Sequence, residues 1–323
     1  MEKINLTQSG RGYLIRIAAS DACNFNCAFC RPEKKAPVDM LENEELLKII
    51  RVICKKYVVK TIHFTGGEPL LRKDLDFVIA ECRKIADPNV EIAMTTNGAL
   101  LQGKIDKFVR AGLSRVNISL HTLDQARYEM ITGTGLAVNK VKNVIEEACK
   151  SGLIVKTNSV IIRGCNDIDL KDIMDFSFSC GALPRFLELG LYGPVSNWFK
   201  SENVMMRDEL IKRIEKIYGP ITQDNTVRGN GPTKYYFTSD GKVLGIVDHQ
   251  SNKLCIGCDR FRLSSNGKIR VCNFEAMDLK QFIASDEHLE NAIDLLGNQL
   301  ASRGMDYINK RIHKIDYNFR WNR

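Results

Sequence analysis

The sequence has no long apolar run, and none of its apolar stretches approaches the roughly 20 residues that a helix needs to cross a bilayer. Its opening residues, MEKINLTQSGRG, lack the apolar centre of a signal peptide. No internal repeat or low-complexity tract interrupts the chain, so neither a fibrous nor a disordered class is indicated. We therefore expect a soluble, cytoplasmic protein without a membrane partner.

Composition and charge are those of an ordinary globular protein. Hydrophobic residues make up 44% of the 323 residues and charged residues 27%, which leaves material for a large core. The net charge of +8 would favour anionic partners, but the charges are spread along the whole sequence. We expect most of them to lie on the solvated surface. No dense strip of basic and aromatic residues is present, so we expect no nucleic-acid partner.

Between about residues 12 and 190, short β-branched runs alternate with amphipathic helical stretches, a pattern typical of βα units around a parallel sheet. Six such units predict an α/β fold in which the sheet curls into a partial (βα)6 TIM-like barrel. The strand candidates read YLIRIAAS, VKTIHFT, VEIAMTT, SRVNISL, IVKTNSVII and RFLELGL. In barrels of this kind the chemistry lies at the carboxyl ends of the strands.

The alternation stops after about residue 195, which predicts two parts: residues 1–195 as the barrel and residues 196–323 as a C-terminal extension. The extension contains Asp240-Gly241 and Asn266-Gly267, both signals of a type I′ hairpin. A helical stretch, HLENAIDLLGNQLASRG, and a basic, aromatic tail follow. We therefore expect short antiparallel strands and a helix after the barrel.

The eleven cysteines indicate metal binding rather than disulfides, because clustered thiols in a reducing cytosol more often bind metal. Six of them are clustered and need a chemical explanation. The others stand singly in apolar or helical stretches, where a small buried hydrophobe is the expected role. These single cysteines are Cys54, Cys82, Cys149, Cys165 and Cys180.

The first cluster, CNFNCAFC, places Cys23, Cys27 and Cys30 in a C-x3-C-x2-C pattern directly after the first strand candidate. Thiolates at this spacing can hold three irons of a cubane cluster and leave the fourth iron open for chemistry. A structural zinc site fits less well, because zinc prefers four ligands and no histidine stands near this loop. The pattern predicts a [4Fe–4S] cluster with an open iron.

A second motif, Gly66-Gly67-Glu68-Pro69, follows the second strand candidate. Two glycines let the backbone approach a ligand closely, and exposed N–H and C=O groups at a strand end can bind the carboxylate and ammonium of an amino acid. Glu68 would add an acceptor for the ammonium. Alone, this motif would indicate merely a turn; its place one βα unit after the cysteine loop indicates a ligand site.

Together with Phe29 before the third cysteine, these two motifs resemble the radical S-adenosylmethionine (SAM) superfamily. The resemblance implies that the open iron binds the amino and carboxylate groups of SAM, and that an electron from the reduced cluster cleaves SAM to methionine and a 5′-deoxyadenosyl radical. That radical would abstract a hydrogen atom from the substrate. The protein would supply position and shielding while the cofactors carry the radical chemistry.

Another three-cysteine set, Cys255, Cys258 and Cys272, lies in LCIGCDRFRLSSNGKIRVC. The Asn266-Gly267 hairpin would fold the chain back, so that Cys272 returns to the other two. These thiols can again hold a cubane with one open iron. From the residues alone, a Cys3His zinc site completed by His249 stays open as an alternative.

A longer resemblance covers most of the chain, and it is to the GTP 3′,8-cyclases of molybdenum-cofactor biosynthesis. The similar segments, in order, are LIRIAASDACNFNCAFCRP, IHFTGGEPLLRKDL, TTNGALL, AGLSRVNISLHTLD, VKTNSVIIRGCND and CDRFRLSSNGKIRVC. In that family the C-terminal cysteine set carries an auxiliary [4Fe–4S] cluster whose open iron contacts the substrate base. The resemblance implies an anionic, nucleotide-like substrate and an electron donor such as flavodoxin or ferredoxin.

The resemblance also assigns site residues. Those assigned to SAM are Phe29, Gly66, Gly67, Glu68 and Ser119. Those assigned to the substrate are Arg16, Thr95, Lys156, Arg185, Arg260 and Arg262. Arg260 and Arg262 alternate on a strand and so project to one face, where guanidinium groups suit phosphate oxygens. A surface charge is the alternative for any one of these basic residues, but the set as a whole favours a shared anionic substrate.

Several positions depart from the family's pattern, and they fall near the substrate rather than near the first cluster. Thr61 and His63 stand where the family has lysine and arginine, which removes positive charge from the expected phosphate pocket. Ala22 replaces an arginine, His121 an aspartate and Gly190 a methionine, and the chain ends in NFRWNR without the family's Gly-Gly pair. These losses favour a related enzyme that cyclises or rearranges another phosphorylated nucleoside. A true GTP 3′,8-cyclase is the alternative.

His63 and His121 are candidate acid/base or hydrogen-bonding groups, since each stands near a strand end that faces the expected cavity. Packing or supporting hydrogen bonds explain such histidines equally well.

Two further classes of protein stay open. A peptide-modifying maturase would usually carry more C-terminal cysteines than these three. A metal-binding regulatory protein on the same barrel would be favoured by loss of GGEP or of a cluster cysteine, and both motifs are intact.

Overall fold

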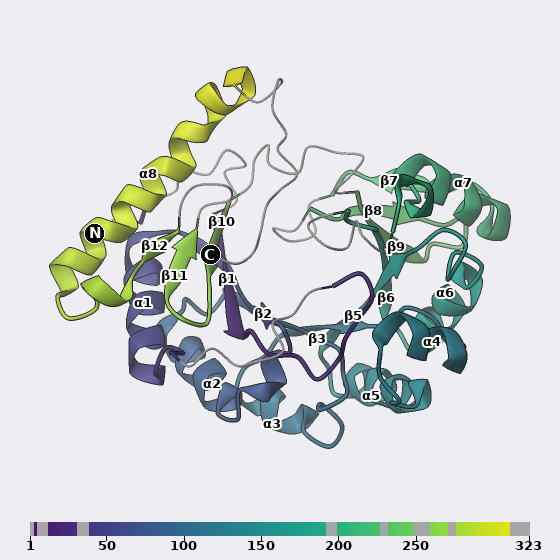
Figure 1. Cartoon of the computed structure of the whole chain (residues 1–323), viewed down its shortest axis with the longest axis horizontal. Coiled ribbons are helices and arrows are strands. Elements are labelled where there is room, and N and C mark those ends of the chain that lie inside the picture. Colours follow the sequence, from purple (N-terminus) through teal and green to yellow (C-terminus); the bar gives the residue numbers. More distant parts are fainter. Residues whose placement is uncertain are drawn as a thin grey trace.

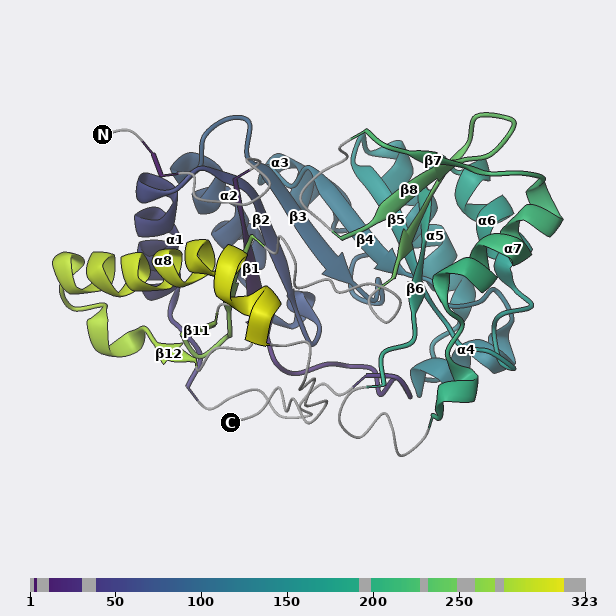
Figure 2. The same ribbon diagram turned by 90° about the horizontal axis from the view of Figure 1, so that it is seen from above.

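The structure is a computed structural model that describes residues 3–4, 12–30, 39–191, 199–226, 232–248, 259–270 and 276–310. Within these residues the strands form one twelve-stranded sheet in the order β12-β11-β10-β1-β2-β3-β4-β5-β6-β9-β8-β7. The sheet is strongly curved, and helices α1 to α6 follow its outer side (Figure 1; Figure 2). The predicted α/β fold with a partial barrel is confirmed.

Six parallel strands in chain order make the wall of the barrel. They are β1 (Tyr13–Ser20), β2 (Val59–Gly66), β3 (Glu91–Thr96), β4 (Arg115–Ser119), β5 (Ile154–Ile161) and β6 (Leu183–Glu188). Successive side chains of a strand point to opposite faces, so each strand supplies one row to the helices and one to the concave side. On β1, for example, Ile15 and Ile17 are fully buried in the core, while Arg16 between them lies on the other face.

Six helices lie along the outer side of the sheet, and all of them except α4 bury an apolar stripe. They are α1 (Asn43–Lys56), α2 (Leu75–Ile85), α3 (Ile105–Arg110), α4 (Gln125–Thr132), α5 (Val138–Lys150) and α6 (Leu170–Ser179). In α1, the buried side chains include Leu46, Ile49, Ile50 and Ile53, the three- and four-residue spacing of an amphipathic helix. A capping box between Glu42 and the third residue of the helix fixes where α1 begins.

The C-terminal extension continues the barrel sheet at both edges. Its strand β10 (Arg260–Leu263) pairs in parallel with β1, and β9 (Val243–Val247) pairs in parallel with β6. The sheet ends in antiparallel pairs on each side, formed by β7 (Thr222–Asp224), β8 (Lys234–Phe237), β11 (Lys268–Arg270) and β12 (Met277–Asp278). The predicted boundary between residues 195 and 196 lies outside the described residues.

Both predicted hairpins are present, but the predicted type I′ turns are wrong. After β8, the Thr238 N–H donates to the Lys242 carbonyl (2.9 Å), and the Gly241 N–H donates back to the Thr238 carbonyl (2.9 Å). The connection is therefore a three-residue loop with its glycine at φ 79°. Ser264 and Gly267 repeat this arrangement between β10 and β11, with φ 84° at the glycine. In both loops a glycine accepts the left-handed conformation that a side chain would strain.

Two more helices belong to the extension: α7 (Arg207–Tyr218) and α8 (Asp286–Lys310). The second of these lies along α1 (Figure 1), where the Lys56 ammonium is 2.6 Å from the Asp294 carboxylate. The Tyr57 hydroxyl also donates to Asp294 (3.1 Å), and Gly297 makes room for the Tyr57 ring, since a Cβ at Gly297 would lie 2.1 Å from the phenol oxygen.

Across the described residues, no helix combines the length and apolar character needed to span a membrane.

Candidate active site

The first cysteine motif forms a loop, residues 21–30, directly after the carboxyl end of β1. Cys23 and Cys27 are half-buried, and Cys30 is exposed. Burial, followed by the nearby thiols of Cys30 and Cys23, raises the pKa of Cys27 to about 12. All three cysteines lie on this one short loop, and the charges of Cys23 and Cys30 act on Cys27.

Three thiols on one short loop are a suitable donor set for iron, which binds them as thiolates. The Phe25 N–H already donates to the Cys23 sulfur (3.4 Å), and the Asn97 amide lies 3.9 Å from the same atom. Among the described residues, no three carboxylate, imidazole or thiol groups are placed to share one metal ion. In a cubane each thiolate binds a different iron, so the loop fits the predicted [4Fe–4S] cluster.

The end of α4 supports the cysteine loop. The Asn26 N–H donates to the Thr132 carbonyl (3.0 Å). The Ala28 N–H donates to the Ile131 carbonyl (2.8 Å). Gly133 permits this close approach, because a Cβ there would lie 2.6 Å from the Asn26 carbonyl oxygen. The backbone that carries the cysteines is therefore fixed by a helix end rather than by the thiols alone.

The GGEP turn lies directly against the start of the cysteine loop. The Gly67 N–H donates to the Ser20 carbonyl and the Glu68 N–H to the Ala22 carbonyl, each at 2.8 Å. No side chain fits at Gly67, since a Cβ would lie 2.2 Å from the Ala22 carbonyl oxygen. Gly66 has φ 126° and is equally crowded against Ser20. The two motifs that the sequence singled out thus form one continuous structure.

The buried Glu68 side chain stabilises the GGEP turn through hydrogen bonds. Its carboxylate is 1% exposed and accepts hydrogen bonds from the Thr96 hydroxyl (2.7 Å), the Asn97 N–H (2.8 Å) and the Leu70 N–H (3.1 Å). Burial raises the pKa of Glu68 to about 7. Both carboxylate oxygens are therefore engaged by the protein. Direct contact between Glu68 and SAM stays a prediction.

His121 lies just after β4 and packs edge-on against Phe29, with ring centroids 4.8 Å apart. Its Nδ1 accepts the Val160 N–H (3.2 Å), so its proton is on Nε2. Burial lowers the pKa of His121 to about 4, which keeps the ring neutral at pH 7. Ser119 ends β4 close by in sequence and is half-buried. The contacts of His121 are those of a packing residue; its predicted catalytic role stays a prediction.

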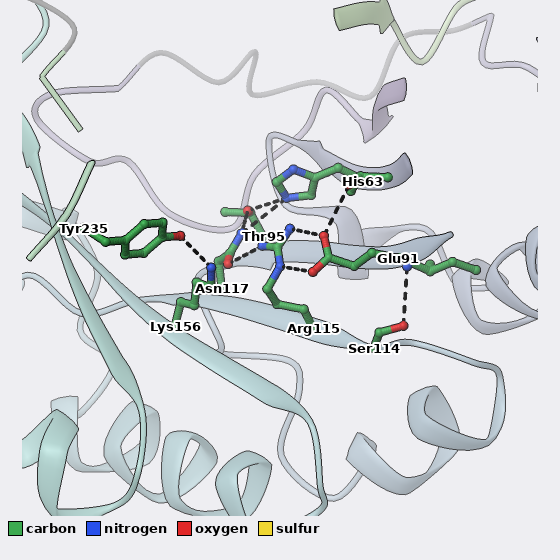
Figure 3. Close-up of polar contacts among 10 residues, drawn as sticks. His63, Glu91, Thr95, Ser114, Arg115, Asn117, Lys156 and Tyr235 are labelled. Carbon is green, nitrogen blue, oxygen red and sulfur yellow. Dashed lines mark hydrogen bonds and ion pairs between the residues drawn. The ribbon is translucent and has the colours of Figure 1, made fainter. Parts of the chain in front are cut away.

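The concave face of the sheet carries a second group of polar residues (Figure 3). Arg16 lies beside His63 on β2 and beside Arg262 on β10. The arginines at positions 16, 185 and 260 are near enough to act on the charge of His63. Several cations gather on this face together with the carboxylate of Glu91. The cations include Arg16, Arg115, Lys156, Arg185, Arg260 and Arg262.

A chain of hydrogen bonds crosses three strands of this face (Figure 3). The His63 Nε2 and the Thr95 hydroxyl are 2.8 Å apart. Asn117 donates to the same hydroxyl (2.9 Å) and accepts from the Arg115 guanidinium (2.7 Å). Burial, followed by Arg115 and Arg16, lowers the pKa of His63 well below its usual value. His63 is therefore a neutral hydrogen-bonding group and not an additional cation.

Arg115 is also paired with the carboxylate of this face. Its Nε and Nη2 donate to the two oxygens of Glu91 at 2.7 and 2.8 Å, a bidentate arrangement. Thr61 donates to Glu91 as well, at 3.4 Å. Although burial opposes it, Arg115 lowers the pKa of Glu91. Glu91 is thus committed to Arg115.

The cations show the effect of their crowding. Burial, followed by Arg115, lowers the pKa of Arg185 to about 10. Burial is also the first cause of the lowered pKa of Lys156. Like charges gathered in a concave, partly desolvated place are unfavourable unless an anion joins them, and phosphate oxygens are the natural partners of guanidinium groups. The face is a candidate site for a phosphorylated ligand.

The structure gathers most of the predicted substrate residues on this face, and their contacts with a substrate stay predictions. It also adds residues that the sequence reasoning missed: Glu91, Arg115, Asn117, Asn158 and Tyr235. A signal was available, because RVNIS places polar side chains at alternate positions of a strand whose other positions are buried and apolar. Cys255, Cys258 and Cys272, with His249, lie outside the described residues, so their ligand roles stay predictions.

Replacing Glu91 with glutamine is expected to lower the free energy of unfolding by about 1–3 kcal/mol, because it leaves Arg115 among other cations without its counter-charge. Thermal unfolding of the apo-protein would measure the loss. Inorganic tripolyphosphate should restore stability to E91Q more than to the parent protein. E44Q, at an exposed position of α1, is the control and should change stability by less than about 0.5 kcal/mol. An E91Q protein as stable as E44Q would contradict the expectation.

Comparisons with known proteins match both parts of the chain. Residues 17–177 match the family model described as the radical SAM superfamily. Residues 184–308 match the model described as Molybdenum Cofactor Synthesis C. A GTP 3′,8-cyclase of Clostridium botulinum is 33% identical over 287 residues, which are 87% of this chain and 88% of that protein.

Further matches agree with these. A probable GTP 3′,8-cyclase of Archaeoglobus fulgidus is 35% identical over 265 residues, covering 80% of this chain and 84% of that protein. Among solved structures, SuiB of Streptococcus suis bound to S-adenosylmethionine aligns with a TM-score of 0.64 at 13% identity, covering 90% of this chain and 68% of that chain. At that identity the likeness concerns the fold.

Proposed function

Because the chain belongs to the radical SAM superfamily and, within it, to the family of the GTP 3′,8-cyclases, we propose that it cyclises a nucleoside triphosphate, with GTP as the first candidate. The protein is a radical SAM enzyme, and its cofactors are SAM and a [4Fe–4S] cluster, joined by an auxiliary cluster. The observation that carries the proposal is the concave face, on which buried cations gather around the carboxylate of Glu91. A triphosphate would bring anionic oxygens that suit guanidinium and ammonium groups.

When bound, the cluster and SAM supply a 5′-deoxyadenosyl radical that abstracts a hydrogen atom from the substrate. The thiolates of Cys23, Cys27 and Cys30 would hold the cluster at the carboxyl end of β1. The GGEP backbone, fixed to the same loop by Gly67 and Glu68, would hold the amino-acid end of SAM. Since the cysteines and the turn form one structure, a shift of either would misplace the reacting atoms relative to the substrate.

On the substrate side, the cationic residues would bind the phosphates, and the neutral hydrogen-bond chain would orient the nucleoside. His63 and Asn117 both contact the Thr95 hydroxyl, so the direction of that hydroxyl is fixed before a ligand binds. A preset hydroxyl and amide can discriminate between groups on a base or ribose. We propose this positioning role for His63 in preference to proton transfer.

A second candidate is the same class of reaction on another phosphorylated nucleoside. It is favoured by the two neutral positions in the middle of the cationic face. Thr61 contacts Glu91, and burial, followed by the arginines around it, keeps His63 uncharged by lowering its pKa. A face with these neutral groups binds fewer phosphate oxygens than one with two more cations.

The proposed function is tested by anaerobic incubation of the reconstituted, reduced enzyme with SAM and GTP, in parallel with UTP and GMP. We expect 5′-deoxyadenosine together with a 3′,8-cyclised GTP product, both followed by mass spectrometry. R16A should raise the KM for GTP about tenfold through the loss of a phosphate contact, whereas R110A, at an exposed end of α3, should leave it unchanged. Turnover of UTP or GMP with GTP unchanged would favour the second candidate. Failure to form 5′-deoxyadenosine with every nucleotide would contradict both.

We also propose that a low-potential protein such as flavodoxin or ferredoxin delivers the electron. The exposed Cys30 supports this, because it places one edge of the cysteine loop at the protein surface. Acidic donors of this type would suit the net positive charge of the chain.

A further inference from the structure

We propose that Tyr235 is the positioning residue that joins Lys156 and Arg185 into one phosphate-binding pair; the inference rests on the proposed function, in which these cations meet the substrate. Tyr235 comes from β8 in the C-terminal extension, while the two cations belong to the barrel strands β5 and β6. The extension would thereby complete the substrate site. Nothing in the sequence around Tyr235 indicated this role.

Tyr235 contacts both cations through its hydroxyl. The Lys156 ammonium donates to the phenol oxygen at 2.7 Å and also lies 5.0 Å from the centre of the ring (Figure 3). Arg185 forms a side-chain hydrogen bond to the same tyrosine. Tyr235 and Lys156 are 5% and 9% exposed, so these contacts lie away from bulk water. One small acceptor therefore fixes two long, flexible side chains whose charges repel each other.

The arrangement depends on a gap in the neighbouring strand. Gly245 on β9 lies between Arg185 on one side and Tyr235 on the other in the register of the sheet. A Cβ at this glycine would lie 3.0 Å from Arg185 Cγ and 3.3 Å from the Tyr235 ring. It would also lie 2.6 Å from the methyl group of Thr233. The missing side chain thus lets the arginine and the phenol reach each other across β9.

The other contacts of Lys156 and Arg185 fix the two side chains without using all of their N–H donors. The Arg185 guanidinium donates twice to the Asn158 side-chain oxygen, at 2.9 and 2.6 Å, which fixes its plane. Ammonium and guanidinium groups have more N–H donors than these contacts use, so donors are left for phosphate oxygens. Burial raises the pKa of Tyr235, but the nearby Lys156 ammonium lowers it, and the net shift is downward. This direction agrees with a phenol oxygen that accepts hydrogen bonds from cations. The tyrosine thus acts through the cations rather than on reacting atoms.

The test is the affinity of the reconstituted enzyme for inorganic tripolyphosphate and for GTP, measured by calorimetry for Y235F and K156M, alone and combined. We expect Y235F to weaken tripolyphosphate binding about tenfold, through the loss of one hydrogen bond to charged groups. Y236F is the matched control, because Tyr236 is the next residue of β8 and packs in the core on the opposite face. It should change the affinity by less than about twofold. Iron content and thermal unfolding of each variant check that the fold and cluster are intact.

The double variant separates positioning from general destabilisation. In the K156M background, Y235F should weaken tripolyphosphate binding by only about threefold or less, because one of its two partners is already gone. An undiminished tenfold effect in that background, or no effect of Y235F in either background, would overturn the inference. If tripolyphosphate binding follows the expected pattern while GTP is not bound, the proposed substrate fails and the role of Tyr235 stands. If GTP is turned over and Y235F matches Y236F, the proposed function stands and the role of Tyr235 falls.

Discussion

Replacing Cys27 with alanine is expected to abolish the cleavage of SAM, lowering the rate of 5′-deoxyadenosine formation by about a thousandfold or more. The charge of its thiol is coupled to both other cysteines of the loop, which identifies Cys27 as a shared neighbour of Cys23 and Cys30. Two remaining thiols cannot hold three irons of a cubane, so the variant should lose iron and sulfide together with activity. Iron and sulfide analysis and anaerobic mass spectrometry of 5′-deoxyadenosine would measure both losses.

Cys149 provides the matched control for this experiment. It is also a half-buried cysteine, but it lies on α5 and packs with the apolar residues between the helices and the sheet. C149A should retain its iron and its rate of SAM cleavage and lose about 1 kcal/mol of stability at most. A C27A protein with the full iron content of C149A and an unchanged rate would mean that the cluster is held elsewhere.

The barrel could be predicted because its signals are local. In β1 and α1, apolar residues recur with the period of a strand and of a helix, and those positions are the buried ones. Every predicted barrel strand overlaps an observed one. The amphipathic stretches that predict helices, NEELLKIIRVICKKY, LDFVIAECRKIA, KIDKFVRAG and the stretch around NKVKNVIEEACKSG, overlap α1, α2, α3 and α5. Burial of such a stripe depends on the sequence within a few turns, so no knowledge of distant segments is needed.

Of the helices that were missed, α4 (Gln125–Thr132) lacks a clear stripe. In α4, Tyr128 and Ile131 are buried, but Met130 between them is 61% exposed, so apolar residues do not mark one face. Its ends carried the usable signal: Asp124 accepts the Arg127 N–H at the start, and Gly133 with φ 61° ends the helix. Tertiary packing, rather than periodicity, stabilises a short helix of this kind. The helix α6 (Leu170–Ser179) was missed as well, although its buried residues Leu170, Ile173 and Met174 follow helical spacing.

The candidate site also has a part that local sequence predicts and a part that depends on distant segments. The cysteine loop and the GGEP turn could be predicted because each is a short motif whose chemistry is complete within a few residues. The bidentate pair of Arg115 and Glu91 joins residues 24 positions apart, and the bond of Lys156 to Tyr235 spans 79. Such contacts depend on the register between strands and on which strand pairs with β6, and neither is encoded in a local pattern.

The hairpins of the extension illustrate a finer limit. Asp-Gly and Asn-Gly dipeptides predict a reversal correctly, but two loop lengths are compatible with them. At Gly241 the chain uses the longer loop, and the Thr238 hydroxyl accepts the Lys242 N–H (3.0 Å) to stabilise it. A side-chain hydrogen bond of this kind favours one turn type over another, and the Asp-Gly dipeptide alone does not predict it.

The second large effect is expected at Gly67. Replacing it with alanine should weaken SAM binding about a hundredfold, because the new Cβ would lie 2.2 Å from the Ala22 carbonyl oxygen and 2.6 Å from its carbon. These are backbone atoms, so the clash is relieved only by moving the GGEP turn away from the cysteine loop. Equilibrium binding of SAM to reconstituted enzyme, together with iron content, would measure the effect.

Gly135 is the control, since it is exposed, has no atom within 4 Å of an added Cβ and does not require a left-handed conformation. G135A should bind SAM as the parent protein does. In G67A, the separation of turn and loop would break the hydrogen bonds from Gly67 and Glu68 to the backbone at Ser20 and Ala22. Iron content that is retained while SAM binding is lost would assign the turn to the ligand; loss of both would assign it to the loop as well. SAM binding within about threefold of G135A would contradict the proposal that this backbone meets SAM.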